Sequence, residues 1–127
     1  MLVSIIIPVY NGEKVLRRLV DIILSSKSND FELILVNDDS VDQTSSICEE
    51  YKNTDNRCIV INKENEGVSA ARNDGIFASH GEYVYFCDCD DELDMNVFEN
   101  ICLYLKHNHV DILLTDFIYK FNYDREN

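Results

Sequence analysis

The sequence predicts an α/β protein, a three-layer α/β/α sandwich built on a mostly parallel, Rossmann-like sheet. The apolar pattern changes repeatedly between strand and helix spacing along the chain, which indicates alternating βα units. The strand-like runs are short and nearly continuous, as are strands that are buried on both faces of a sheet. The length of 127 residues fits one domain.

The first two strands and helices follow from the apolar spacing. Residues 2–9 form a β-branched run, which predicts a buried strand. The apolar positions 15, 16, 19, 20 and 23 then have the spacing of an amphipathic helix, and Asn11 is its expected N-cap. Residues 31–36 predict a second buried strand, and residues 43–51 predict a second helix.

The next unit is shorter and richer in alanine. Residues 58–61 predict a third strand, and residues 67–78 predict a helix. We expect Gly81 to end this helix as a left-handed C-cap, because glycine adopts a positive φ without a steric penalty.

The last predicted elements flank a group of acidic residues. Residues 83–87 predict a fourth strand, and Asp94 is the expected cap of a helix with apolar positions 97, 98, 101, 102 and 105. Residues 111–117 predict a fifth strand. Strands and helices therefore alternate from end to end, which implies a mostly parallel sheet with helices on both faces.

The composition excludes several classes of partner. The chain has 24 acidic and 11 basic residues, a formal charge of −13 with histidine neutral. Nucleic acids and anionic membrane surfaces are bound by clustered Lys and Arg, so we expect neither as a partner. The five cysteines are an odd number without a C-x-x-C pair, which indicates free buried thiols rather than disulfides or a zinc site.

Polar side chains follow three of the predicted strands, at residues 8–11, 37–40 and 88–91. Ligands of parallel α/β sheets bind beyond the carboxyl ends of the strands. Asp88 and Asp90 have the i, i+2 spacing that lets two carboxylates converge on one hard cation, and Mg²⁺ or Mn²⁺ suits oxygen ligands. Such a cation would let an anionic diphosphate bind to this acidic chain.

Other sites fit the sequence less well. No G-x-G-x-x-G follows the first strand, and no P-loop sequence occurs. A phosphoacceptor receiver domain would carry its acidic pair after the first strand, where this chain has Tyr10 and Asn11. The acidic spacing from 88 to 99 matches a calcium loop, but Leu93 stands where that loop needs glycine. A solvated acidic loop before a helix is the plainest alternative.

Four polar segments follow one another along the chain: PVYN at 8–11, VNDDSVD at 36–42, NEGVSAARN at 65–73 and FCDCDD at 86–91. In order and spacing they resemble the successive signatures of family-2 glycosyltransferases with the GT-A fold. The resemblance covers essentially the whole chain. It implies a single GT-A donor-binding domain over 1–127, which ends before the acceptor-binding half of the family.

The resemblance implies a nucleotide-sugar site, usually for a UDP-sugar. The residues that match the family's donor site are Pro8, Val9, Tyr10, Asn11, Asp38, Arg72, Asp88 and Asp90. The first four would line the nucleoside pocket. Asp38 would accept a hydrogen bond from the base, and Arg72 would lie beside the base and phosphates. Asp88 would lie near the ribose and the metal, and Asp90 would bind Mg²⁺ or Mn²⁺ directly.

The implied activity is the inverting transfer of a hexose-type sugar to a hydroxyl of a saccharide or lipid-linked acceptor. The metal would stabilise the departing diphosphate. The implied setting is polysaccharide or surface glycan synthesis in the cytoplasm, at the inner face of the membrane. The donor motifs serve equally well in a non-catalytic nucleotide-sugar-binding module or an inactive fragment, so that alternative stays open.

The chain departs from the family at two points. Asp39 stands where the family often has glycine, at a tight turn. The catalytic base of the family is expected beyond residue 127, because Asp111 and Asp116 match positions in a structural strand. A chain that ends here should expose apolar surface, so we expect either self-association or a partner that carries the acceptor half.

Overall fold

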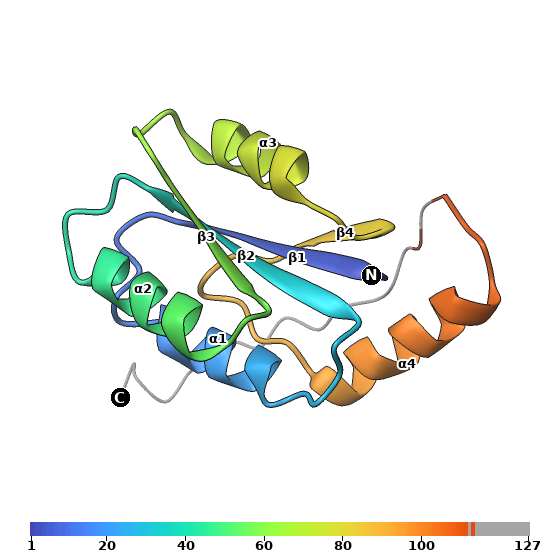
Figure 1. Cartoon of the computed structure of the whole chain (residues 1–127). Coiled ribbons are helices and arrows are strands. Elements are labelled where there is room, and N and C mark those ends of the chain that lie inside the picture. The colour runs from blue at the N-terminus through green and yellow to red at the C-terminus, as the bar shows by residue number, and fades with distance from the viewer. Residues whose placement is uncertain (112, 114–127) are drawn as a thin grey trace, which may run out of the picture.

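A computed structural model of the chain describes residues 1–111 and 113 (Figure 1). The strands are β1 (Val3–Val9), β2 (Phe31–Asp38), β3 (Cys58–Lys63) and β4 (Tyr83–Phe86). The helices are α1 (Leu16–Leu24), α2 (Thr44–Thr54), α3 (Val68–Ala78) and α4 (Met95–His107). The predicted alternation of strands and helices is confirmed over the described residues.

The strands form a parallel four-stranded sheet in the order β3-β2-β1-β4. The chain builds outward from β1 to β3 and then returns to the other side of β1 for β4. The order therefore reverses between β1 and β4. In open parallel sheets this reversal leaves a crevice at the carboxyl ends of the strands, where ligands bind.

Helices cover both faces of the sheet (Figure 1). α1, α2 and α4 pack on one face, where Ile5 and Ile7 of β1 join the larger apolar cluster. α3 packs on the other face, where Ile6 joins a smaller cluster with Ala71. Because successive strand residues point to opposite faces and both faces are covered, β1 is apolar along its length except at Ser4, which is buried near its start. The predicted three-layer sandwich is confirmed.

The N-cap prediction for Asn11 is wrong. α1 begins at Leu16 without a side-chain cap. Asn11 instead lies in the left-handed region with a φ of 49°, and its Oδ1 accepts a hydrogen bond from the Val41 N–H at 2.9 Å. The loop after β2 takes the side chain that the sequence pattern assigned to the helix.

The predictions for the ends of the other helices have mixed outcomes. Asp94 caps α4 as expected, because its carboxylate accepts hydrogen bonds from the N–H groups of Asn96 and Val97. Gly81, however, is not a left-handed C-cap. A Cβ there would lie 2.5 Å from the backbone nitrogen of Ser4, so glycine is needed for close approach to β1.

Three remaining features concern the end of the chain, membrane spans and the cysteines. The expected strand at 111–117 falls largely outside the described residues, as does Asp116. Within the described part, no helix has the length and apolar character needed to cross a bilayer. All five cysteines are free, as expected.

Candidate functional site

The loops after β1, β2 and β4 leave the sheet at its carboxyl edge. Val9 of β1 pairs in register with Asn37 of β2, and Ile6 pairs with Phe86 of β4. A Cβ on Gly12 would lie 3.4 Å from the Sγ of Cys89, so the β1 loop packs against the loop after β4. The structure thus brings the predicted segments 8–11, 37–40 and 88–91 to one edge.

The loops after β1 and β2 are joined by a set of hydrogen bonds. The Asn11 N–H donates to the Oγ of Ser40 at 2.9 Å, and the Gly12 N–H donates to the Oγ1 of Thr44 at 2.9 Å. The Gln43 N–H donates to the Oε2 of Glu13 at 3.0 Å. These bonds tie the segment that contains Tyr10 and Asn11 to the loop after β2.

The turn after β2 has the geometry expected from the sequence. Asp39 has a φ of 60°, in the left-handed region that glycine adopts most easily. Aspartate tolerates this region better than most residues, so the turn forms with Asp39 in place of glycine. The Asp39 carboxylate is then exposed beside the buried Asp38.

Asp38 is a buried carboxylate at the end of β2, with 5% of its surface exposed. Its Oδ1 accepts a hydrogen bond from the N–H of Glu66 at 3.2 Å, and Glu66 lies in the loop between β3 and α3. No hydrogen bond from the described residues reaches Oδ2. This oxygen can therefore accept a hydrogen bond from an N–H of a ligand.

Arg72 extends from α3 toward the end of β4. Its Nη2 lies 3.3 Å from the Oδ1 of Asp88, and its guanidinium lies 5.8 Å from the centre of the Phe86 ring. The pair is partly exposed, so it contributes little stability by itself. The Nε of Arg72 is buried and has no hydrogen-bond partner among the described residues. The guanidinium therefore has unused donors for an anionic ligand.

Residues 88–91 form a compact exposed turn. The Asp88 N–H donates to the Oδ2 of Asp91 at 2.9 Å, and the Asp91 N–H donates to the backbone oxygen of Asp88 at 3.0 Å. The carboxylates of Asp88 and Asp90 are left exposed at the edge. Burial first, and the neighbouring carboxylates next, raise the pKa of Cys89, so this thiol stays protonated at neutral pH.

The two exposed carboxylates of Asp88 and Asp90 are oxygen ligands of the type that Mg²⁺ and Mn²⁺ prefer. Over residues 1–111 and 113, no group of three or more His, Cys, Asp or Glu side chains is arranged to hold a metal ion without other ligands. Mg²⁺ is commonly bound by one or two carboxylates together with substrate phosphates and water. Asp88 and Asp90 supply two such carboxylates.

Two predicted nucleoside contacts differ in their placement. Tyr10 is 53% exposed at the edge, where its ring is available to a ligand. Val9 is 1% exposed, and its side chain belongs to the apolar core. Val9 can therefore contact a ligand through its backbone alone. Pro8 lies between them in exposure.

Sequence reasoning missed Lys63 at the end of β3. Its side chain is 8% exposed, and its Nζ lies 3.1 Å from the Oδ2 of Asp74 on α3. The signal was present, because Lys63 continues the alternation of Ile59 and Ile61, which pack beneath α3.

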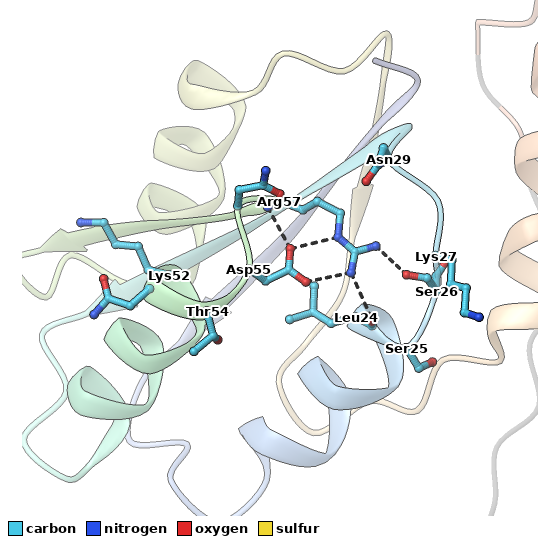
Figure 2. Close-up of a pocket in the computed structure, with 11 residues that line it drawn as sticks. Leu24, Ser25, Ser26, Lys27, Asn29, Lys52, Thr54, Asp55 and Arg57 are labelled. Carbon is cyan, nitrogen blue, oxygen red and sulfur yellow. Dashed lines mark hydrogen bonds and ion pairs between the residues drawn. The ribbon is translucent and has the colours of Figure 1, made fainter.

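A separate hollow lies away from the carboxyl edge. An open hollow of about 840 Å³ lies at the amino edge of the sheet, beside the last turns of α1 and α2 (Figure 2). Its wall is formed around Arg57, which donates to the backbone oxygens of Leu24 at 3.0 Å and Ser26 at 2.6 Å and to the carboxylate of Asp55. The guanidinium thus satisfies the end of α1, and we assign the hollow a structural role.

Comparisons with known proteins agree with this geometry. The model of the family described as "Glycosyl transferase family 2" matches residues 4–127. The chain is 40% identical over 124 residues to the "Uncharacterized glycosyltransferase EpsJ" of Bacillus subtilis (strain 168), covering 98% of this chain and 36% of that protein. It is 35% identical over 123 residues to the "Minor teichoic acid biosynthesis protein GgaA" of the same organism, covering 91% of this chain and 28% of that protein.

A solved structure has the same fold. The crystal structure of S. aureus TarS 1-349 in complex with UDP-GlcNAc superposes with a TM-score of 0.78 at 30% identity, covering 86% of this chain and 32% of that one. The chain thus spans about a third of the length of these three proteins. The match over residues 4–127, with the parallel sheet and the polar edge described above, shows that the chain belongs to glycosyl transferase family 2 and has its GT-A fold.

Proposed function

We propose that this chain is the donor-binding domain of a glycosyltransferase, which moves a sugar from a UDP-sugar to a hydroxyl acceptor. The observation that carries the proposal is the meeting of segment 8–11, Asp38, Arg72 and the pair Asp88 and Asp90 at the carboxyl edge of the sheet. The TarS structure named above, which contains UDP-GlcNAc, supports a uridine nucleotide as the first ligand to test.

Each group at the edge has a role that its geometry suits. The free Oδ2 of Asp38 would accept a hydrogen bond from a base N–H, and Tyr10 would lie against the base. Arg72 would turn from Asp88 to the diphosphate, since charge-assisted bonds to phosphate are stronger than an exposed ion pair. Asp90, with Asp88, would hold Mg²⁺ or Mn²⁺.

A bound divalent cation supplies Lewis-acid stabilisation of the charge that builds on the leaving diphosphate. The formal charge of −13 supports a role for such a cation, because an acidic chain repels an anionic donor. The protein's own contribution is to hold the base and sugar-diphosphate in a fixed direction along the edge. Preorganised groups of this kind lower the barrier without reorganisation during the reaction.

The finer assignments also belong to the proposal. The transfer would be a single inverting displacement to a saccharide or lipid-linked hydroxyl, in polysaccharide or surface glycan synthesis at the cytoplasmic side of the membrane. The base that deprotonates the acceptor is not assigned to Asp111 or to any other described residue. Acceptor binding would come from a further domain, a partner chain or a second copy. A non-catalytic module that binds the same donor is the second candidate, because the edge described here serves both.

The test is calorimetric titration of UDP into the chain, with and without Mn²⁺. We expect binding that depends on Mn²⁺ and is lost in Asp90→Asn. Asp111→Asn is the matched control, because Asp111 is exposed and follows α4, away from the edge. Equal binding by Asp90→Asn would remove the metal assignment. If neither UDP, GDP nor CDP binds to the folded chain, the donor-site proposal is wrong.

A further inference from the structure

Lys63 places one nearly buried ammonium group among three carboxylates beside the candidate site. Its side chain is 8% exposed, and its Nζ lies 3.1 Å from the Oδ2 of Asp74 and 3.9 Å from the Oε2 of Glu66. Lys63 also stands directly opposite Asp38 in the register of β3 and β2. The three carboxylates belong to α3, to the loop before it and to β2.

The ammonium is charged at neutral pH. Burial by itself lowers the pKa of Lys63, but the hydrogen bond to Asp74 and the charges of Asp74, Glu66 and Asp38 outweigh it and leave the pKa raised. A buried charge is tolerated when it is paired in this way, and removal of one partner leaves the others uncompensated.

Through Asp74, Lys63 holds the helix that carries Arg72. Arg72 and Asp74 are two residues apart, about 200° around the helix, so they point to opposite flanks of α3. Asp74 is paired with Lys63 on the β3 flank, and Arg72 is paired with Asp88 on the β4 flank. Between them Gly75 lies so close to Ile6 that a Cβ would overlap its side chain. The position of α3 on the sheet therefore determines where the guanidinium of Arg72 lies relative to Asp88.

Through Glu66, Lys63 also acts on the environment of Asp38. The Glu66 carboxylate faces Lys63, and the Glu66 N–H donates to the Oδ1 of Asp38. The next residue, Gly67, has a φ of 95°, so the loop turns sharply into α3 at this point. The same ammonium thus lies beside the loop that orients Asp38, at the long distance of 3.9 Å from Glu66.

We propose that Lys63 is a positioning residue of the donor site, which holds α3 and the 64–67 loop so that Arg72 and Asp38 together bind a nucleoside diphosphate. The inference rests on the proposed function. Lys63 reaches the donor through these two residues. Its charge also offsets the carboxylates of Asp74 and Glu66, which would otherwise add to the repulsion of an anionic ligand.

The test compares UDP binding by the wild-type chain, Lys63→Met, Asp74→Ala and the double variant, in calorimetry with Mn²⁺. We expect Lys63→Met to weaken UDP binding about tenfold, a size typical of residues that act through another. Asp74→Ala should weaken binding less, because Glu66 still faces the ammonium. The double variant should bind no more weakly than Lys63→Met alone, since both changes break the same link.

The matched control is Lys52→Met. Lys52 is an exposed lysine in the last turn of α2, at the opposite edge of the sheet, and its loss should leave UDP binding unchanged. Every titration is made well below the melting temperature of each variant, measured by circular dichroism. Loss of folded protein then does not appear as loss of affinity.

The outcomes separate the inference from the proposed function. Wild-type affinity in folded Lys63→Met overturns the inference, even if its melting temperature falls, because Lys63 would then be structural only. If Lys63→Met does not fold, Asp74→Ala decides, and wild-type affinity in that variant overturns the inference as well. Failure of the wild-type chain to bind UDP, GDP or CDP overturns the proposed function itself, without reference to any variant.

Discussion

Glu32 is a buried carboxylate at the amino edge of the sheet, and its loss tests how β4 is attached. It is 3% exposed, and its Oε2 accepts hydrogen bonds from the Ser4 hydroxyl and the His80 N–H, both at 2.6 Å. Its Oε1 lies 3.0 Å from the Nδ1 of His80. One side chain of β2 thus joins β1 to the connection between α3 and β4.

We expect Glu32→Ala to lower the free energy of unfolding by about 3 kcal/mol. The change leaves the Ser4 hydroxyl and the His80 N–H without their acceptor, and each buried group so stranded costs roughly 1–3 kcal/mol. The two groups together would cost roughly 2–6 kcal/mol, and the 71% exposure of the His80 side chain, which lets water approach this residue, keeps the total in the lower half of that range. The loss is a large share of the roughly 5–15 kcal/mol that stabilises a domain.

The effect of Glu32 should also depend on pH. Burial by itself raises the pKa of the Glu32 carboxyl, but the hydrogen bonds from Ser4 and His80 outweigh it and hold the pKa below its ordinary value. A lowered pKa means that the folded state favours the ionised carboxyl. Its contribution is therefore complete above the unfolded pKa of about 4.3 and is lost as the pH falls through the folded value.

The assay is urea unfolding followed by far-ultraviolet circular dichroism, because the chain has no tryptophan for fluorescence. Wild type and Glu32→Ala are compared at pH 7 and through the acid range. Glu82→Ala is the control, because Glu82 is an exposed carboxylate 3.7 Å from an exposed His109 and should change stability little. A difference below about 0.5 kcal/mol between Glu32→Ala and the control at pH 7 would refute the reasoning.

Three other changes test the fold and the edge. Arg57→Ala should lower the free energy of unfolding in urea by about 3 kcal/mol, because it leaves Asp55 and the carbonyls at the end of α1 without their partner. The Kd for UDP should stay unchanged. Weaker UDP binding would place the hollow of Figure 2 in the site. Gly75→Ala should push α3 away from Ile6, which lowers the free energy of unfolding by about 1–3 kcal/mol and weakens UDP binding. An unchanged Kd would show that the distance of α3 from the sheet does not affect the site. Asp39→Gly should keep the turn, shift the melting temperature little and tighten UDP binding by removing a carboxylate; weaker binding would make Asp39 a donor contact.

The elements that depend on local pattern were predictable from the sequence. Buried strands such as β1 are specified by their own apolar runs, and α4 is specified by its apolar spacing and by Asp94 one residue before it. The edge of the sheet followed as well, because parallel strands bring their carboxyl ends together whatever the details of the loops.

The features that depend on distant contacts were not predictable in the same way. Asn11 was expected to cap the helix beside it, but a backbone N–H 30 residues further along the chain takes its side chain. Gly81 was expected to serve the preceding helix, but it is required by the backbone of Ser4. The alternation along β3 places Lys63 on the same face as Ile59 and Ile61, but its charged partners could not be predicted, because they lie on three other segments. In each case the sequence shows the residue, but its contact depends on the order of the strands in the sheet and could not be predicted from local pattern.

The contacts at the carboxyl edge divide the candidate site into two unlike halves. On the β2 side, hydrogen bonds join the loops after β1 and β2, and Asp38 is held through Glu66 and Lys63. On the β4 side, the turn at 88–91 is held by its own hydrogen bonds, and its outward contact to α3 is the weak pair with Arg72. Groups that read the shape of a base need a fixed frame, whereas groups that meet a cation and a diphosphate must exchange partners when the charge arrives. Under the proposed function, this arrangement would place rigidity where recognition of a base needs it, and would leave Arg72 and the carboxylates of the turn free to change partners when a donor binds.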